Sequence, residues 1–214
     1  MAQTILVHSN SADGYITVAN TTNWATSRDA TSGTADHNDT NNQYAVRARK
    51  VASGRGTQWR VTRAFFAFDT SAITAAPVSG TLNIVGYSSG TADIRVVKSI
   101  QGNTLANADF NAIVGWTTGD NSSNVRYYDT VETTTWSTSA YNSIILSQTA
   151  LSDIASLDTF KLCLLEADYD LTDTEPGTGV DIYNGCYFAD DTSGSRDPYI
   201  EIHPDNTIFF GTNF

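Results

Sequence analysis

One apolar run constrains the fold of this chain more than any other feature. Residues 64–68 are three phenylalanines and two alanines, preceded by Arg63 and closed by the turn-forming triplet 69–71. A short, continuous apolar run that ends in turn residues is typical of a β-strand buried on both faces. We therefore predict that the segment 63–73 provides the central core strand of a β-sandwich.

The composition favours an all-β class. Thr, Ser, Asn, Asp and Gly are plentiful, and lysine occurs only at Lys50, Lys98 and Lys161. A chain of this length can bury about 70% of its unfolded surface, so it needs no disulfide or metal to hold a core. No repeat or linker divides the sequence. We expect a single jelly-roll-type β-sandwich of about ten antiparallel strands over residues 1–204, with an apolar tail at 205–214.

The strand patterns lie at 4–8, 15–18, 44–51, 58–73, 81–87, 92–99, 125–128, 133–136, 143–146, 160–166, 181–188 and 199–202. Two short helices are expected in connections, at 108–114 and 149–157, behind the capping residues Asn107 and Ser147. Residues 19–42 are polar and predict a long loop around Trp24. We expect residues 88–90 to form a hairpin, and the last strand to close the sheet at an edge.

The charge is unevenly distributed along the chain. Residues 1–107 hold nine basic and six acidic residues, whereas residues 108–214 hold three basic and seventeen acidic ones, for a total of −11. This acidity argues against a nucleic-acid partner, because such affinity comes mainly from neutralising phosphates. Six basic residues gather without an intervening acid: Arg47, Arg49, Lys50, Arg55, Arg60 and Arg63. They either pair with the acidic half of this fold or of a neighbouring copy, or form a docking patch, chiefly through Arg47, Arg49 and Arg55.

The N-terminal residues lack the basic and apolar parts of a signal peptide. No apolar run approaches the roughly 20 residues that span a bilayer, so no membrane partner is expected. We expect synthesis in a cytoplasm. Cys163 and Cys186 lie in apolar runs, and in that compartment reduced, buried thiols are favoured over a disulfide.

The residues that most often carry catalysis are sparse. His8, His37 and His203 are the only histidines, and none has the spacing of a zinc site or stands beside a serine-nucleophile motif. We therefore expect no enzymatic activity. Four carboxylates between two strands are candidate calcium ligands, with a solvated acidic loop as the alternative: Asp168, Asp170, Asp173 and Glu175. No other cofactor is expected.

Aromatic residues provide two candidate binding surfaces. Trp24, Trp116 and Tyr127 lie in or beside loops, where they either stack on a glycan or cap the ends of the core. The tail contains four large apolar residues, Ile208, Phe209, Phe210 and Phe214. Left in water, these side chains would promote aggregation. We expect them to dock on a neighbouring subunit or another protein, or to fold back on their own domain.

Three strand motifs follow one another in a characteristic order. They are Arg63-Ala64-Phe65-Phe66-Ala67-Phe68-Asp69 leading to Ile73, then Pro77-Val78-Ser79-Gly80-Thr81-Leu82-Asn83-Ile84, then Arg196-Asp197-Pro198-Tyr199-Ile200-Glu201-Ile202. Together they resemble DNRLRE-type domains, which are jelly rolls similar to carbohydrate-binding modules. Such domains recur in bacterial surface proteins and in structural proteins of tailed bacteriophages. The resemblance implies the fold first and a class of function second.

From these features we expect a non-enzymatic structural protein of a bacteriophage virion, either a capsid decoration or a tail or fibre component. It would be made in the host cytoplasm and would associate with further copies of itself, for instance as a trimer, and with other virion proteins. The alternative is a carbohydrate-binding module that acts at a cell or virion surface, with a glycan as its partner.

Overall fold

The computed structural model describes residues 4–54, 56–117, 124–191 and 194–205. Its strands are β1 (Ile5–His8), β2 (Gly14–Asn20), β3 (Thr34–Asp36), β4 (Asn41–Ser53), β5 (Gly56–Asp69), β6 (Ser79–Gly90), β7 (Ile94–Lys98), β8 (Tyr141–Ile145), β9 (Thr159–Glu166), β10 (Val180–Tyr187) and β11 (Tyr199–His203). The helices are α1 (Trp24–Arg28), the 3-10 helix η1 (Asn107–Asp109), α2 (Gln148–Ser156) and the π-helix η2 (Ala167–Leu171).

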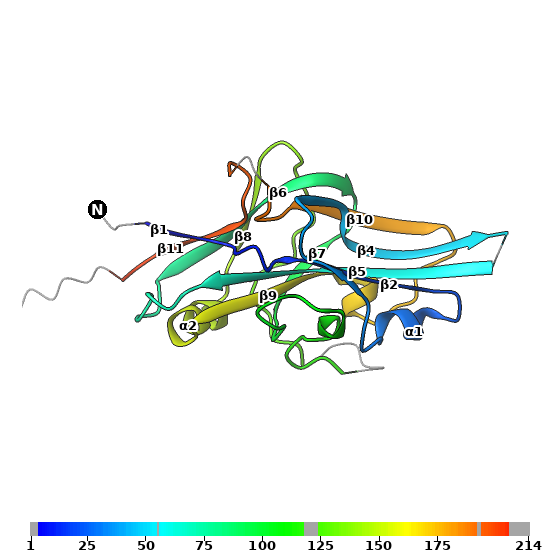
Figure 1. Ribbon diagram of the computed structural model, residues 1–214, viewed down its shortest axis with the longest axis horizontal. Helices are drawn as coiled ribbons and strands as arrows, with labels where there is room; N and C mark the ends of the chain where they lie inside the picture. Colours follow the sequence, from blue (N-terminus) through cyan, green and yellow to red (C-terminus); the bar gives the residue numbers. More distant parts are fainter. Residues whose placement is uncertain (1–3, 55, 118–123, 192–193, 206–214) are drawn as a thin grey trace, which may run out of the picture.

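The antiparallel sheet folds back on itself into two layers. Strands β1, β11, β6 and β8 make one layer, while β7, β9, β5, β2 and β3 belong to the other. Strand β10 pairs with both β6 and β4, and β4 pairs with β5, so these two strands join the layers. The predicted all-β sandwich is therefore confirmed. The hairpin of β4 and β5 extends to one end of the molecule, and β1 and β11 lead to the other (Figure 1).

The central strand β5 is buried on both faces, as predicted. All eight of its residues from 61 to 68 are buried. Ala64, Phe66 and Phe68 point between the two layers, where Phe66 stacks on Phe188 with ring centroids 5.7 Å apart. They pack in an inner core with side chains of the neighbouring strand β9 and of the facing strands β6, β8 and β11: Phe160, Leu162, Leu164, Leu82, Ile84, Ile144, Ile200 and Ile202.

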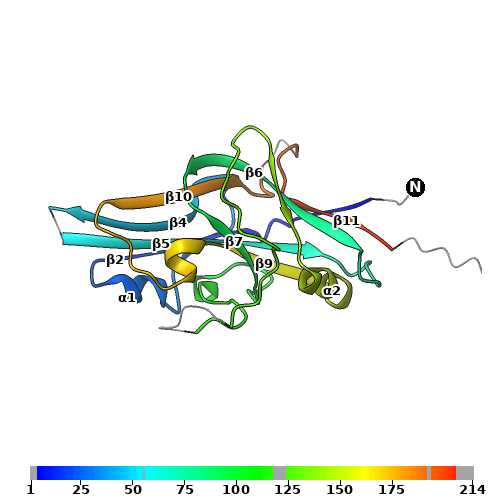
Figure 2. The same ribbon diagram turned by 180° about the vertical axis from the view of Figure 1, so that it is seen from behind.

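The opposite face of β5 supports an outer core. Val61 and Phe65 point to this side, together with Val97 of β7 and Leu165 of β9. Helix α1, the connection after β7 and helix η2 cover this face, away from β6 and β10 (Figures 1 and 2). Strand β5 is thus buried on both faces, because the other sheet layer covers one face and the connecting segments cover the other.

Several predicted elements differ in the structure. The segment 19–42 contains α1 and β3, and α1 begins where the Asn23 side chain accepts the Thr26 N–H at 2.8 Å. The helix expected at 108–114 is only the short η1, whereas that expected at 149–157 is confirmed as α2. Residues 125–128 and 133–136 form isolated bridges rather than strands.

Two predictions about strand pairing are wrong. Strands β6 and β7 do not form a hairpin, because β6 pairs with β8, β10 and β11 whereas β7 pairs with β9 in the other layer. Strand β11 is not an edge strand, because it lies between β1 and β6. Both arrangements depend on strands that are far apart in sequence. The local pattern of residues does not indicate which strands pair.

Both cysteines are free and buried, as predicted. Cys186 lies in the inner core and Cys163 in the outer core. Burial raises the pKa of both thiols, because the charged form loses its hydration. No helix in the described part of the chain is long and apolar enough to cross a membrane.

Candidate functional site

A buried arginine in the middle of β5 gathers the connections that form the outer layer. Arg63 is fully buried. Its Nε and Nη2 donate to the two carboxylate oxygens of Asp170 at 2.8 and 2.7 Å. Its Nη1 donates to the Phe110 carbonyl at 2.8 Å, and Nη2 also donates to the Arg28 carbonyl at 3.0 Å. One side chain therefore holds α1, the connection after β7 and η2 against the sheet.

A second buried arginine completes this cluster. Arg28 is also fully buried, and its Nε donates to the Asp170 carbonyl at 2.9 Å. The guanidinium carbons of Arg28 and Arg63 each lie 4.0 Å from the centroid of the Trp116 ring. Glu166 accepts the Asp170 N–H at 3.1 Å and so fixes the first turn of η2. These charges are paired inside the protein, so we assign the cluster a structural role.

The four predicted calcium ligands are not brought together. Asp170 binds Arg63, and Asp173 accepts the Trp24 indole N–H at 3.2 Å. Glu175 accepts the Trp59 indole N–H and lies within 2.8 Å of the Lys50 ammonium. Three of the four carboxylates thus have partners within the fold.

Asp168 alone joins an acidic cluster, with Asp93 and Glu132, in which carboxylate oxygens lie within 4.8 Å of one another. Partial burial raises the pKa of Glu132, and the charges of Asp93 and Asp168 add to that rise. The sequence analysis did not single out Asp93 or Glu132, and calcium binding by this chain stays a prediction.

The three predicted glycan-binding aromatics contact the fold itself. Trp24 is 4% exposed and belongs to the outer core. Trp116 faces the two buried arginines, and the Arg95 guanidinium lies 4.1 Å from the centroid of the Tyr127 ring. Trp24 therefore fits the alternative interpretation, in which these rings cap the core.

The basic cluster pairs with carboxylates of the acidic half of the chain. Arg47 binds Asp181 at 2.6 Å, and the Arg49 Nε lies 3.4 Å from the same carboxylate. Lys50 pairs with Glu175 and Arg63 with Asp170. The predicted pairing within the fold therefore holds for these four residues. Arg55 lies outside the described residues, so its predicted role in docking stays a prediction.

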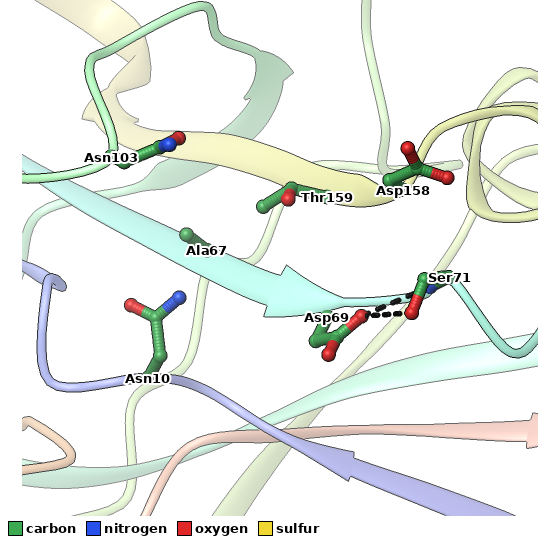
Figure 3. A pocket seen from close by; sticks show the side chains of 7 residues that line it. All are labelled: Asn10, Ala67, Asp69, Ser71, Asn103, Asp158 and Thr159. Atoms are coloured by element: carbon green, nitrogen blue, oxygen red, sulfur yellow. Dashed lines mark hydrogen bonds between the residues drawn. The ribbon is translucent and has the colours of Figure 1, made fainter.

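A shallow polar groove crosses the outer face of β5 where the covering connections stop. The small side chain of Ala67 leaves a hollow of about 420 Å³ (Figure 3). Asp69 accepts hydrogen bonds from the Ser71 backbone N–H at 3.1 Å and hydroxyl at 2.6 Å, and these bonds lower its pKa. The lining residues come from four segments: Asn10, Ala67, Asp69, Ser71, Asn103, Asp158 and Thr159.

This polar groove offers mixed hydrogen-bond donors and acceptors. Lys161 donates to the Asn103 side-chain oxygen at 3.0 Å, which orients that amide. A neighbouring hollow of about 390 Å³ shares Asn10 and Asn103 and adds His37. Amide and carboxylate groups that converge in this way can bind a ligand rich in hydroxyl groups. No sequence signal marks the groove, because its residues are single polar positions from distant segments.

An apolar groove lies at the end of the molecule where β1 begins and β11 ends. It has a volume of about 180 Å³. Its lining is mostly apolar: Ile5, Ala72, Ile73, Thr74, Ala75, Pro77, Ile202 and Pro204. The predicted docking residues Ile208, Phe209, Phe210 and Phe214 follow Pro204 closely in sequence but lie outside the described residues.

The histidines occupy separate positions: His8 ends β1, His37 follows β3 and His203 ends β11.

Comparison with models of known protein families and with curated protein sequences finds no match to this chain. The likeness to DNRLRE-type domains therefore rests on the three strand motifs. These motifs supply β5 in one layer and β6 and β11 in the other.

Replacing Asp170 with Asn should lower the free energy of unfolding by about 3–5 kcal/mol, because the buried Arg63 guanidinium loses its countercharge. Urea denaturation followed by tryptophan fluorescence measures this loss. Asp168→Asn, in the same helix but exposed, is the matched control and should change stability by no more than about 0.5 kcal/mol. Equal losses in the two variants would contradict the structural role of the cluster.

Proposed function

We propose that this chain is a non-enzymatic structural protein of a bacteriophage virion, a capsid decoration or a tail or fibre component. In this proposal it associates with further copies of itself and docks on other virion proteins. The three strand motifs support the virion assignment through their resemblance to phage structural domains. The sandwich fold agrees with the fold that this resemblance implies.

The observation that carries the proposal is the apolar groove at the end of β11. The chain leaves the described structure beside Pro204, which lines the groove, and four large apolar residues follow. Burying each of them would contribute roughly 1.5–3 kcal/mol. The occupant we propose for the groove is this segment of a neighbouring copy. Strand β1 lies beside it as an edge of the sheet, and such edges readily accept another chain.

Light scattering on the full chain and on a shortened chain ending at Pro204 tests this self-association. The full chain should be a defined oligomer and the shortened chain a monomer. Within the full chain, Ala75→Asp should weaken the oligomer, because it places a charge in the groove. Val131→Asp is the control, since Val131 is exposed elsewhere on the surface. Two monomers, or two identical oligomers, would contradict the proposal.

A second candidate function, carbohydrate binding, is favoured by the polar groove. Its amide and carboxylate side chains suit sugar hydroxyl groups. Asn10, Asp69 and Asn103 are exposed and lie around Ala67 (Figure 3). The binding surface in this case would be the groove rather than Trp24, Trp116 and Tyr127, whose rings contact the fold.

Glycan-array binding by the intact protein tests this second function. Asn103→Ala should reduce the signal for a bound glycan at least about tenfold, since each lost hydrogen bond leaves a polar partner unpaired. Asn124→Ala, an exposed amide distant in sequence from the groove, should bind as the unchanged protein does. A blank array, or full binding by Asn103→Ala, would contradict it.

A further inference from the structure

Three arginines lie on a single face of the hairpin formed by β4 and β5, beside one carboxylate of β10. Arg47 and Arg49 lie on β4, and Arg60 lies on β5 directly opposite Arg49. Asp181 of β10 is placed opposite Arg49 on the other side of β4. We name this set, Arg47, Arg49, Arg60 and Asp181, the arginine face. It carries two more positive than negative charges within a chain whose net charge is −11.

Arg47 uses the carboxylate most fully. Its Nε and Nη2 donate to the two oxygens of Asp181 at 2.7 and 2.6 Å, which is a bidentate pair. Its guanidinium carbon also lies 3.8 Å from the centroid of the Tyr44 ring, and the side chain is 3% exposed. Both oxygens of Asp181 therefore already accept a hydrogen bond from Arg47.

Arg49 and Arg60 are left short of acceptors. The Nη1 of Arg49 donates to the Gln58 side chain at 3.1 Å. Its buried Nε lies 3.4 Å from the Asp181 oxygen that already accepts from Arg47, and it forms no hydrogen bond among the described residues. The Nε of Arg60 is buried and unpaired in the same way. In the described part of the chain, no carboxylate lies within ion-pair distance of Arg60. A buried donor without an acceptor is unfavourable.

The arrangement also sets like charges against each other. Cationic residues directly opposite in neighbouring strands destabilise the pair. Burial lowers the pKa of Arg60, and the charges of Arg47 and Arg49 lower it further, whereas Asp181 and Tyr44 act in the opposite direction. The carboxylate of Glu175 does not offset this repulsion, because it pairs with Lys50 beside Trp59. Lys50 follows Arg49 along the strand.

We infer that the arginine face binds an oxyanion between Arg49 and Arg60, of the class of sulfate, phosphate or carboxylate. Guanidinium groups present N–H donors in a planar fork that matches such oxygens. The bound anion would pair with both guanidinium groups and would offset the repulsion between the two cations. This inference does not depend on the proposed virion function. It concerns the hairpin of β4 and β5, which extends to the end of the molecule away from β1 and β11 (Figure 1).

Isothermal titration with sodium sulfate, with sodium chloride at equal ionic strength as the reference, tests the site on the full chain. The unchanged protein should bind sulfate, and its melting temperature should rise more with sulfate than with chloride. Arg60→Gln should weaken sulfate binding at least tenfold. Without sulfate this variant should be no less stable than the unchanged protein, because it removes a like-charge contact.

Arg126→Gln is the matched control. It removes the same charge from an exposed arginine outside the face, and it should bind sulfate as the unchanged protein does. If Arg60→Gln fails to fold, Arg60→Lys provides the test, since it keeps the charge without the fork and should also bind more weakly. Equal responses to sulfate and chloride, undiminished binding by the Arg60 variant, or equal losses in the Arg60 and Arg126 variants would overturn the inference.

Discussion

The buried ion pair between Arg63 and Asp170 determines how the outer layer of this protein is arranged. A charge in the middle of an apolar strand is unfavourable unless it is paired and hydrogen-bonded. Arg63 meets this requirement only if three separate connections meet at one point, because its acceptors belong to Asp170, Phe110 and Arg28. Phe65 and Val61, on either side of Arg63 on the same face, are then covered by the same connections.

The inner and outer cores are therefore stabilised in different ways. The inner core is built of alternating apolar residues of both layers. The connections that cover the outer core are held by the buried ion pair of Arg63 and Asp170. Towards the end of β5, the exposed side chains of Asn10, Asp69 and Asn103 line the polar groove (Figure 3). The two ends of the sandwich differ as well, with the arginine face at one and the apolar groove at the other.

The sequence allowed the parts of the fold with strong local signals to be predicted. The apolar run 64–68 has the length and turn residues of a buried strand, and Ser147 marks the start of α2. The partner of Arg63 could not be predicted, because Asp170 is 107 residues away and looks like any other member of an acidic loop. For the same reason Asp170 was expected to bind a cation from solution, whereas the cation it binds is an arginine.

The candidate sites depended even more on long-range contacts. Pairing of the basic cluster with the acidic half of the chain followed from the charge pattern, but the shortage of acceptors at Arg60 did not. That shortage arises from the register that places Arg60 opposite Arg49. The polar groove likewise needs Asn10 and Asn103 to meet across β5. The aromatic residues chosen as glycan ligands had the right chemistry, but their ring faces are taken up by neighbouring arginines and the core.

Amide hydrogen exchange of the Arg63→Lys variant tests the central claim most directly. Lysine keeps the positive charge but cannot reach the three acceptors at once. The account predicts that amides of α1, of residues 107–116 and of η2 lose protection together, while those of β6 and β11 stay as protected as in the unchanged protein. Faster exchange confined to the neighbours of residue 63, or spread evenly over both layers, would contradict it.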